Sequence, residues 1–492
     1  MKSMKKFAAL ILIFTLIFTL FGGCKDDSPD QGEDIVGVSN ISDQKEGTLK
    51  LAYSKADLLD PFTSSMSANL QIIGLIYDGL YKLDGGYEPI PVVAKSSIVS
   101  GTTVNVTLDS RVFSDGSAVT ANDVVYSFEQ ARYSPSHSEK LKNFESATVS
   151  ASNMLIFTLK SPDPYALSCL TFPIVKNGSQ GELPIGCGRY VPQESGESVY
   201  LVVNTKKPGF NPAIKTIMLV PVRDSSSIES SLEIGNTGFY FNDLSSGTYL
   251  RINAQTVDMG INNFVYLGIN SASEVFSNAL IRQALNLVIN RNEITTTAFQ
   301  GHARQVYTPF NPDWYTLKEK DLVISLDYEK AAALITDSGV DIKGKEINLL
   351  FNKDNQFKLE AAEFIKASLE KLGFTVKLKN YSADYYTEAV EMGAYDLYIG
   401  EIRLSPNMDL SPFFSGNASY GINPECASAA RYAQLLSGKC ELMDFINTFN
   451  EDLPFIPICY RNAAASYTNS MKCSFAGCDS DVFYDIETWS FK

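Results

Sequence analysis

The sequence predicts an α/β fold built around more than one hydrophobic core. In two parts of the chain, residues 103–131 and 328–400, segments with strand periodicity accompany segments with helical periodicity and helix-capping residues. Strands and helices in alternation are typical of α/β domains. The chain has 492 residues, which is longer than a single core normally supports.

The first of these parts predicts a strand, a tight turn and a capped helix. Thr103–Leu108 alternates apolar and polar residues, as a half-buried strand does. Ser114–Ser117 contains Asp-Gly, which favours a chain reversal. Thr120, followed three residues later by Asp123, has the spacing of a capping box and begins the helix. One face of this helix is apolar and carries Val124, Val125, Phe128 and Ala131.

In the second part, glycines mark the ends of two expected helices. Gly339 follows a helix over Tyr328–Ser338, and Gly373 follows a helix from about Lys358 to Leu372. The other elements expected here are a helix over Phe276–Phe299 and strands at Ile347–Phe351, Phe374–Leu378 and Asp396–Gly400. Strand ends in a sheet of this kind deliver side chains to a cleft.

The N-terminus predicts export. Three lysines precede the apolar run Phe7–Phe21, which is too short for a membrane span, so we expect a signal peptide over residues 1–23. The sequence Gly22-Gly23-Cys24 is similar to the lipobox of bacterial lipoproteins, which implies that Cys24 is lipidated. Residues 24–46 are polar and acidic, and we expect a flexible tether. An uncleaved membrane anchor is the alternative.

Composition argues against several classes of protein. The net charge is −15 and there is no basic cluster, so nucleic acid is not an expected partner. The two histidines, His137 and His302, lie in no motif, and we expect both at the solvated surface. Apart from Cys24 there are seven cysteines, of which Cys473 and Cys478 could close a small loop. No nucleophile elbow or metal motif is present, so we expect no enzyme, no metal and no cofactor.

Five segments, in the expected order, resemble one known family. The segment FSDGSAVTANDVVYSFEQA (Phe113–Ala131) resembles a segment typical of family 5 extracellular solute-binding proteins, the peptide- and nickel-binding subunits of ABC importers. The other matching segments are Asp60–Ala94, Tyr266–Ile294, Asp327–Val340 and Phe445–Tyr460. The resemblance covers nearly all of the chain after the tether.

This resemblance implies a bilobal periplasmic-binding-protein-like fold (type II, class C). We place lobe one at residues 47–265 plus 465–492, with an extra small subdomain near 86–170, and lobe two at residues 266–464. A peptide or peptide-like solute is expected between the lobes, and the closed form is expected to deliver it to a membrane permease. The resemblance further implies a monomer, held by a lipid on Cys24 at the outer face of the cytoplasmic membrane or facing a periplasm.

The same resemblance locates candidate ligand-binding residues, with three departures from peptide-binding relatives. The Asp that pairs the peptide's amino group in peptide-binding relatives falls near Leu404 here, and the usual Trp just before it is Glu401. Asn352 stands where dipeptide-binding relatives place an Arg for the ligand carboxylate, and another Trp position is Ala383. These departures argue against a standard free dipeptide. Replacement charges are expected from Glu401, Arg403 and Asp409, unless Glu401 and Arg403 pair with each other. The full candidate set is Ser64, Ser65, Trp314, Asn352, Tyr385, Glu401, Arg403 and Asp409; Trp314 and Tyr385 are alternatively core residues.

Three other functions stay open at this point. A non-transport lipoprotein of the same fold that senses a peptide would bind its ligand in the same way. A nickel or metal-chelate binder is disfavoured by the scarcity of histidine. An anchored hydrolase is disfavoured because no nucleophile and base are identifiable.

Overall fold

A computed structural model describes residues 48–179, 183–196, 198–317 and 322–492 of the chain. The expected signal peptide, the tether and Cys24 lie outside the described residues. All described elements belong to one compact unit, Lys45–Lys492. No helix in these described ranges is both long and apolar enough to cross a membrane.

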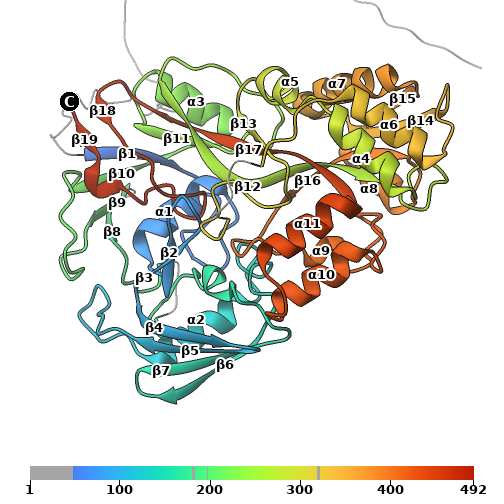
Figure 1. Cartoon of the computed structure of the whole chain (residues 1–492). Coiled ribbons are helices and arrows are strands. Elements are labelled where there is room, and N and C mark those ends of the chain that lie inside the picture. Colours follow the sequence, from blue (N-terminus) through green and yellow to red (C-terminus); the bar gives the residue numbers. More distant parts are fainter. Residues whose placement is uncertain (1–47, 180–182, 197, 318–321) are drawn as a thin grey trace, which may run out of the picture. The chain divides into compact units, whose positions relative to one another are not determined.

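The central feature is a mixed sheet of eleven strands (Figure 1). Ten of them lie in the order β15-β14-β16-β12-β17-β11-β1-β10-β9-β8, and β13 pairs with β17. Their bounds are β1 Thr48–Tyr53, β8 Tyr190–Ser195, β9 Ser198–Val203, β10 Thr216–Pro221, β11 Phe239–Asn242, β12 Gln255–Ile269, β13 Ala303–Gln305, β14 Glu346–Asn352, β15 Thr375–Tyr381, β16 Leu397–Arg403 and β17 Phe455–Tyr467.

A second sheet has four strands in the order β4-β5-β7-β6. Their bounds are β4 Ala94–Ser100, β5 Thr103–Leu108, β6 Phe144–Ala151 and β7 Met154–Leu159. Helix α2, Ala121–Ala131, lies against this sheet (Figure 1). The predicted strand, turn and helix are confirmed here, because Thr120 and Asp123 form a capping box and Val112 bridges to Ala118 across the turn.

The remaining elements connect or cover the two sheets. The helices are α1 Ser67–Ile76, α3 Ser225–Glu233, α4 Ala279–Val288, α5 Arg291–Glu293, α6 Tyr328–Ser338, α7 Gln356–Leu372, α8 Ala383–Glu391, α9 Ser411–Phe414, α10 Ala427–Leu436 and α11 Leu442–Asp452. Short 3₁₀ turns lie at Ala166–Cys169 and Ile486–Thr488, and a π-helical turn lies at Ile294–Ala298. Short strand pairs are β2 Tyr81–Leu83 with β3 Pro89–Pro91, and β18 Met471–Lys472 with β19 Ser490–Phe491.

Two of the three helices predicted after residue 270 end where their capping residues indicate, and the third prediction fails. Helix α6 ends at Ser338 and α7 at Leu372, and the glycine after each has a left-handed backbone. The single helix expected over Phe276–Phe299 is wrong. The chain leaves α4 at Ile289 with an extended backbone, and the side chain of Asn290 caps a new helical turn by accepting from the Glu293 N–H.

Four groups of buried residues form the hydrophobic cores. The β1 core surrounds Leu49, Ile217 and Trp489; the α7 core surrounds Leu285, Leu349 and Ile365; the aromatic core surrounds Phe264, Phe413 and Trp314; and the α2 core surrounds Phe113, Phe128 and Phe157.

Strands β12 and β17 join two of these cores. They pair antiparallel from Gln255–Tyr467 to Gly268–Phe455 and lie side by side in Figure 1. Met259 of β12 packs in the β1 core, whereas Leu267 of the same strand packs in the α7 core. The pairing register shifts between Gly260 and Asn263, so a bulge lies where β12 passes from one core to the other.

Two tyrosines pack over two glycines in the pairing of β12 with β16. Tyr266 lies opposite Gly400, and Tyr398 lies opposite Gly268. A Cβ atom on Gly400 would lie 2.2 Å from Tyr266 Cζ, and one on Gly268 would lie 2.0 Å from Tyr398 Cε1. Only glycine therefore lets the rings lie flat across these strands.

We therefore expect Gly400→Ala to destabilise the protein by about 1–3 kcal/mol, because the buried Tyr266 ring has to move. The measurement is the midpoint of urea unfolding. Gly74→Ala in α1 is the matched control, since nothing lies within 4 Å of its Cβ position. The control should be neutral or slightly stabilising, and an equal loss in both variants would contradict the packing argument.

Candidate functional site

Polar residues form a row across three neighbouring strands of the large sheet. Asn263 of β12 lies directly opposite Arg403 of β16 and Arg461 of β17. Directly opposed residues of antiparallel strands share one face of the sheet, and Glu401, two residues before Arg403, lies on this face too. Further along the same face, Val265 packs in the α7 core. The row therefore begins where the apolar face of the sheet ends.

Glu401 holds two cations in this row. Its Oε1 accepts from Arg461 Nε at 2.8 Å and from Asn263 Nδ2 at 3.0 Å, and its Oε2 lies 3.0 Å from Lys358 Nζ. Burial alone raises the pKa of Glu401, but Lys358 and Arg461 outweigh burial and lower the pKa to about 2. The carboxylate is therefore ionised throughout the neutral range.

Helix α7 begins beside this cluster. Asn355 caps the helix by accepting from the Lys358 N–H at 3.0 Å, and Lys358 itself lies in the first turn. The loop after β11 meets the same end of α7, because Phe357 N–H donates to the Gly247 carbonyl at 3.2 Å. The positive end of the helix dipole thus adds to the two cations bound by Glu401.

These elements line a polar cavity of about 390 Å³ that is open to solvent. Its lining comes from the loop after β11, the polar row, the end of β14 and the start of α7: Ser245, Ser246, Asn263, Asn352, Asp354, Asn355, Lys358, Glu401, Arg403 and Arg461.

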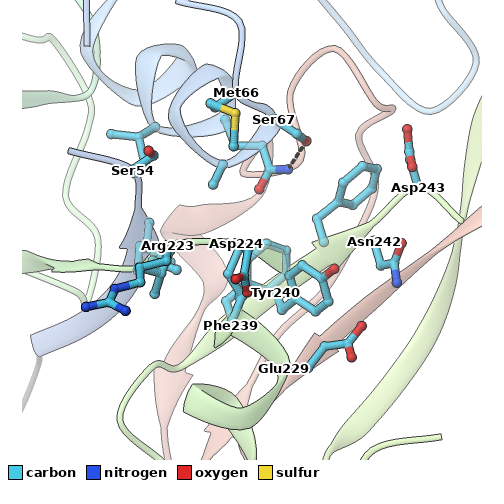
Figure 2. A pocket seen from close by; sticks show the side chains of 18 of the residues that line it. Ser54, Met66, Ser67, Arg223, Asp224, Glu229, Phe239, Tyr240, Asn242 and Asp243 are labelled. Atoms are coloured by element: carbon cyan, nitrogen blue, oxygen red, sulfur yellow. Dashed lines mark hydrogen bonds between the residues drawn. The ribbon is translucent and has the colours of Figure 1, made fainter. Parts of the chain in front are cut away.

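An adjoining groove, with a volume of about 310 Å³, lies beside β1, β11, α1 and α3 (Figure 2). Ser245 and Ser246 line both hollows, so the groove continues from the polar cavity. Apolar side chains such as Ile72 and Phe241 line part of the groove, and Arg223, Asp224 and Glu229 supply charges. One hollow is therefore mainly polar, and the other mixes apolar and charged surface.

Three of the predicted ligand-binding residues come together in the structure. Asn352, Glu401 and Arg403 all line the polar cavity, although Asn352 lies on a different strand from the other two. The alternative that Glu401 and Arg403 pair with each other is wrong. Glu401 binds Lys358 and Arg461, whereas Arg403 pairs with Asp479.

The other predicted residues lie outside the lining of both hollows. Ser64 is buried and its hydroxyl donates to the Asp57 carboxylate, to which the Ser65 N–H also donates. The next residue in the chain, Met66, lines the groove. Tyr385 on α8 is 65% exposed. Trp314 is fully buried, and its ring packs 4.8 Å from that of Tyr165. The expectation of a cleft aromatic at Trp314 therefore gives way to its alternative, a core residue.

Asp409 belongs to a contact between distant parts of the chain. Its carboxylate lies 3.3 Å from Lys142 Nζ, close to where Asn407 Nδ2 donates to Asp163 at 2.7 Å. Burial raises the pKa of Asp163 to about 6, despite the hydrogen bond from Asn407. Asp409 thus joins residues 142–163 to the segment after β16 rather than lining a hollow.

Sequence reasoning missed Asn263, Lys358 and Arg461. Arg461 did carry a signal, because it is the one charged residue within β17, all thirteen residues of which are buried. Such a charge requires a partner. The partner is sixty residues away in the chain and on a strand that is not its immediate neighbour, so the sequence did not identify Glu401.

The expectation of solvated histidines is wrong. His137 Nε2 lies 3.1 Å from the Pro61 carbonyl oxygen, and burial lowers the pKa of this ring well below its usual value. His302 Nδ1 lies 2.6 Å from Asp258, and its ring packs against Tyr249. The described residues contain no group of three His, Cys, Asp or Glu side chains placed to hold a metal. All seven described cysteines are free, including Cys473 and Cys478.

This fold and site define a solute-binding protein. Residues 88–423 match the model of "Bacterial extracellular solute-binding proteins, family 5 Middle", which is more than half of the chain. The chain belongs to this family, whose members are extracellular or periplasmic and bind solutes for ABC importers. The family consists of binding proteins rather than enzymes.

Particular relatives agree with this assignment. The chain is 23% identical to the oligopeptide-binding protein AppA of Bacillus subtilis (strain 168), over 79% of this chain and 74% of the relative. It is 24% identical to the glutathione-binding protein GsiB of Escherichia coli (strain K12), over 73% and 75%. The unliganded open form of MppA, a periplasmic murein tripeptide binding protein, superposes with a TM-score of 0.75 at 20% identity, covering 91% of this chain and 98% of that one. The structural neighbours are bilobal, which confirms the predicted fold class.

We expect Glu401→Gln to cost about 3–5 kcal/mol of stability at pH 7, because Arg461 and Lys358 lose their shared counter-charge while Arg461 stays buried. The folded-state pKa of Glu401 lies below its usual 4.5, so its stabilising contribution is present above pH 4.5 and is lost as the pH falls toward 2. The difference between variant and wild type should shrink over this range in urea unfolding.

Glu346→Gln is the control for this prediction. Glu346 forms a solvent-exposed pair with Lys377 at 3.7 Å, and the substitution should change stability by less than about 1 kcal/mol. A loss at Glu401 no larger than that at Glu346 would show that Glu401 is not the anchor of the cluster.

Proposed function

We propose that this chain captures a peptide or peptide-like solute between two closing lobes and delivers it to the permease of an ABC importer. Support comes from the continuity of the polar cavity with the groove, which together offer charged and apolar surface to one extended ligand. An extended peptide can be held by its backbone, while its side chains occupy roomy pockets. The names of AppA, GsiB and MppA, which refer to peptides, also favour this ligand class.

We place the two lobes at residues 47–265 plus 465–492 and at residues 266–464, with a small subdomain near 86–170. The bulge between Gly260 and Asn263 and the change of core along β12 favour a hinge in this strand. A ligand that contacts both lobes only when they are closed shifts the equilibrium by its differential affinity. Moving the population from mostly open to mostly closed requires roughly 5 kcal/mol of such preference.

We further propose a monomer that is exported and held at the outer face of the cytoplasmic membrane through a lipid on Cys24. The lipobox-like sequence before Cys24 and the acidic tether support this arrangement. A peptide sensor of the same fold would share the site and is distinguished by the absence of a cognate permease. The scarcity of histidine disfavours nickel, and turnover of ester or peptide substrates would instead support a hydrolase.

The direct test is mass spectrometry of the small molecules that copurify with the chain. A bound peptide should be recovered, and adding it back to stripped protein should raise the melting temperature by mass action. Recovery of a non-peptide solute with the same thermal effect would replace the peptide with that solute class.

We expect Arg403→Ala to weaken binding of the recovered ligand at least tenfold. Arg403 lines the polar cavity and pairs with Asp479, which lies in the segment assigned to the other lobe, so the substitution removes both a ligand-facing charge and a contact between lobes. Titration calorimetry measures the change. Lys377→Ala, which removes a surface charge elsewhere, should leave the affinity unchanged, and an unchanged affinity for the Arg403 variant would remove that residue from the site.

A further inference from the structure

Two polar contacts join the small subdomain to the segment that follows β16. Asn407 Nδ2 donates to the Asp163 carboxylate at 2.7 Å, and the Asp409 carboxylate lies 3.3 Å from Lys142 Nζ. Lys142 and Asp163 fall within the subdomain that we place near residues 86–170, whereas Asn407 and Asp409 fall within lobe two. Both contacts therefore cross from one proposed lobe to the other.

The backbone of the segment after β16 fixes these two side chains. The Met408 N–H donates to the Ser405 carbonyl at 2.9 Å and closes a turn. Met408 has a left-handed backbone, with a φ of 56°, and its side chain is buried in the aromatic core. Such a backbone is uncommon for a residue other than glycine and persists only where the surroundings hold it. Asn407 and Asp409 therefore flank a residue whose conformation is set by core packing.

Asp163 is a carboxylate in an unfavourable setting. The residue is 4% exposed, and its carboxylate accepts from the Tyr165 N–H and from Asn407. Burial is the main cause that raises the pKa of Asp163 to about 6, and Asp409 raises it further, although both hydrogen bonds act to lower it. Asp163 therefore takes up a proton between neutral and mildly acidic pH.

Asn407 lacks a donor that this proton would supply. Its Oδ1 atom is buried and accepts no hydrogen bond within the part of the chain that the structure describes. A buried carbonyl oxygen without a donor is costly. Ionised Asp163 can only accept, whereas its protonated form carries an O–H that donates. Protonation thus places a donor beside an unsatisfied acceptor and removes the repulsion between Asp163 and Asp409.

Five other titratable groups around this contact keep their charge near pH 6. Burial lowers the pKa of Lys142, but Glu139 and Asp409 outweigh burial and raise it, so Lys142 stays cationic. Asp409 acts on Asp163 from the segment after β16 and is paired with Lys142. Burial raises the pKa of the four remaining groups, which therefore stay neutral: Tyr165, Cys169, Tyr315 and Tyr432.

We propose that Asp163 and Asn407 form an acid-strengthened contact, which draws the small subdomain and lobe two together as the pH falls. This inference rests on the proposed function only in assigning the two sides of the contact to different lobes. The folded-state pKa of Asp163 lies above its usual 3.8, so the stabilisation by protonation is fully present below pH 3.8 and is lost as the pH rises through 6. From pH 7.5 to pH 5, the contact should become about tenfold more favourable relative to its opened form.

The test is hydrogen exchange, measured by mass spectrometry on the full chain purified in detergent and stripped of bound ligand. Backbone amides in residues 404–410 report opening of the contact, after correction for the intrinsic exchange rate at pH 5 and at pH 7.5. Strand β17 is the internal reference, because exchange of its amides requires opening of the large sheet.

Two matched variants accompany the wild type. Asp163→Asn keeps the shape of the side chain, carries no charge at either pH and offers an N–H donor to Asn407. Asp115→Asn removes a carboxylate elsewhere in the same subdomain. Hydrogen bonds from Lys176 and Ser117 lower the pKa of Asp115 to about 2, so this group is ionised at both pH values in the wild type.

We expect the protection of residues 404–410 to rise about tenfold from pH 7.5 to pH 5 in the wild type and in Asp115→Asn. Asp163→Asn should show the acid value of the wild type at both pH values, which a variant that merely fails to fold would not do. The radius of gyration of the ligand-free wild type, measured by small-angle X-ray scattering, should fall over the same range, and that of Asp163→Asn should not change.

Other results would overturn the proposal. Equal protection at both pH values in the wild type, or a wild-type pH response in Asp163→Asn, would show that no acid-strengthened contact exists. The expected protection with a constant radius of gyration would overturn the effect on the lobes. No ligand is present in either measurement, so these results leave the peptide proposal unchanged, and failure to recover a peptide leaves the contact unchanged.

Discussion

The antiparallel pairing of β12 with β17 is the constraint on which the rest of the structure depends. These strands carry the chain between the β1 core and the α7 core, and their pairing satisfies backbone polar groups on both sides of the bulge. A rigid sheet would lock the two cores together. The register is interrupted between Gly260 and Asn263 and again between Val265 and Tyr266, and the first interruption lies at the point of passage, where bending disrupts few paired residues.

The site follows from this geometry. Directly after the bulge, β12 contributes Asn263 to the cavity, and two residues further along the same face Val265 packs in the α7 core, so the face changes from polar to apolar there. A buried arginine there requires a counter-charge, and Glu401 provides one for Arg461 and Lys358 together. The same ion cluster thus keeps the strands β16 and β17 and the helix α7 in fixed relation, and presents donors to the cavity.

Sequence reasoning succeeded where the signal was local and failed where it depended on distant partners. The capping box at Thr120 and Asp123 and the glycines after α6 and α7 are read within four residues, and all are present. The break at Ile289 was missed because the apolar periodicity continues across it, although Asn290 is a good cap. The family resemblance predicted Asn352, Glu401 and Arg403 as site residues, and all three line one cavity. The partners of Glu401 were not predicted, because Lys358 lies 43 residues before it in the chain and Arg461 lies 60 residues after it. No local pattern identifies such partners.

In the proposed mechanism, ligand capture bends two paired strands and is stabilised by a solute that contacts both sides. The most direct measurement is small-angle X-ray scattering of the full chain in detergent, with the detergent contrast-matched or subtracted, before and after addition of the copurifying ligand. The account predicts a smaller radius of gyration with ligand. An unchanged radius at saturating ligand would contradict it.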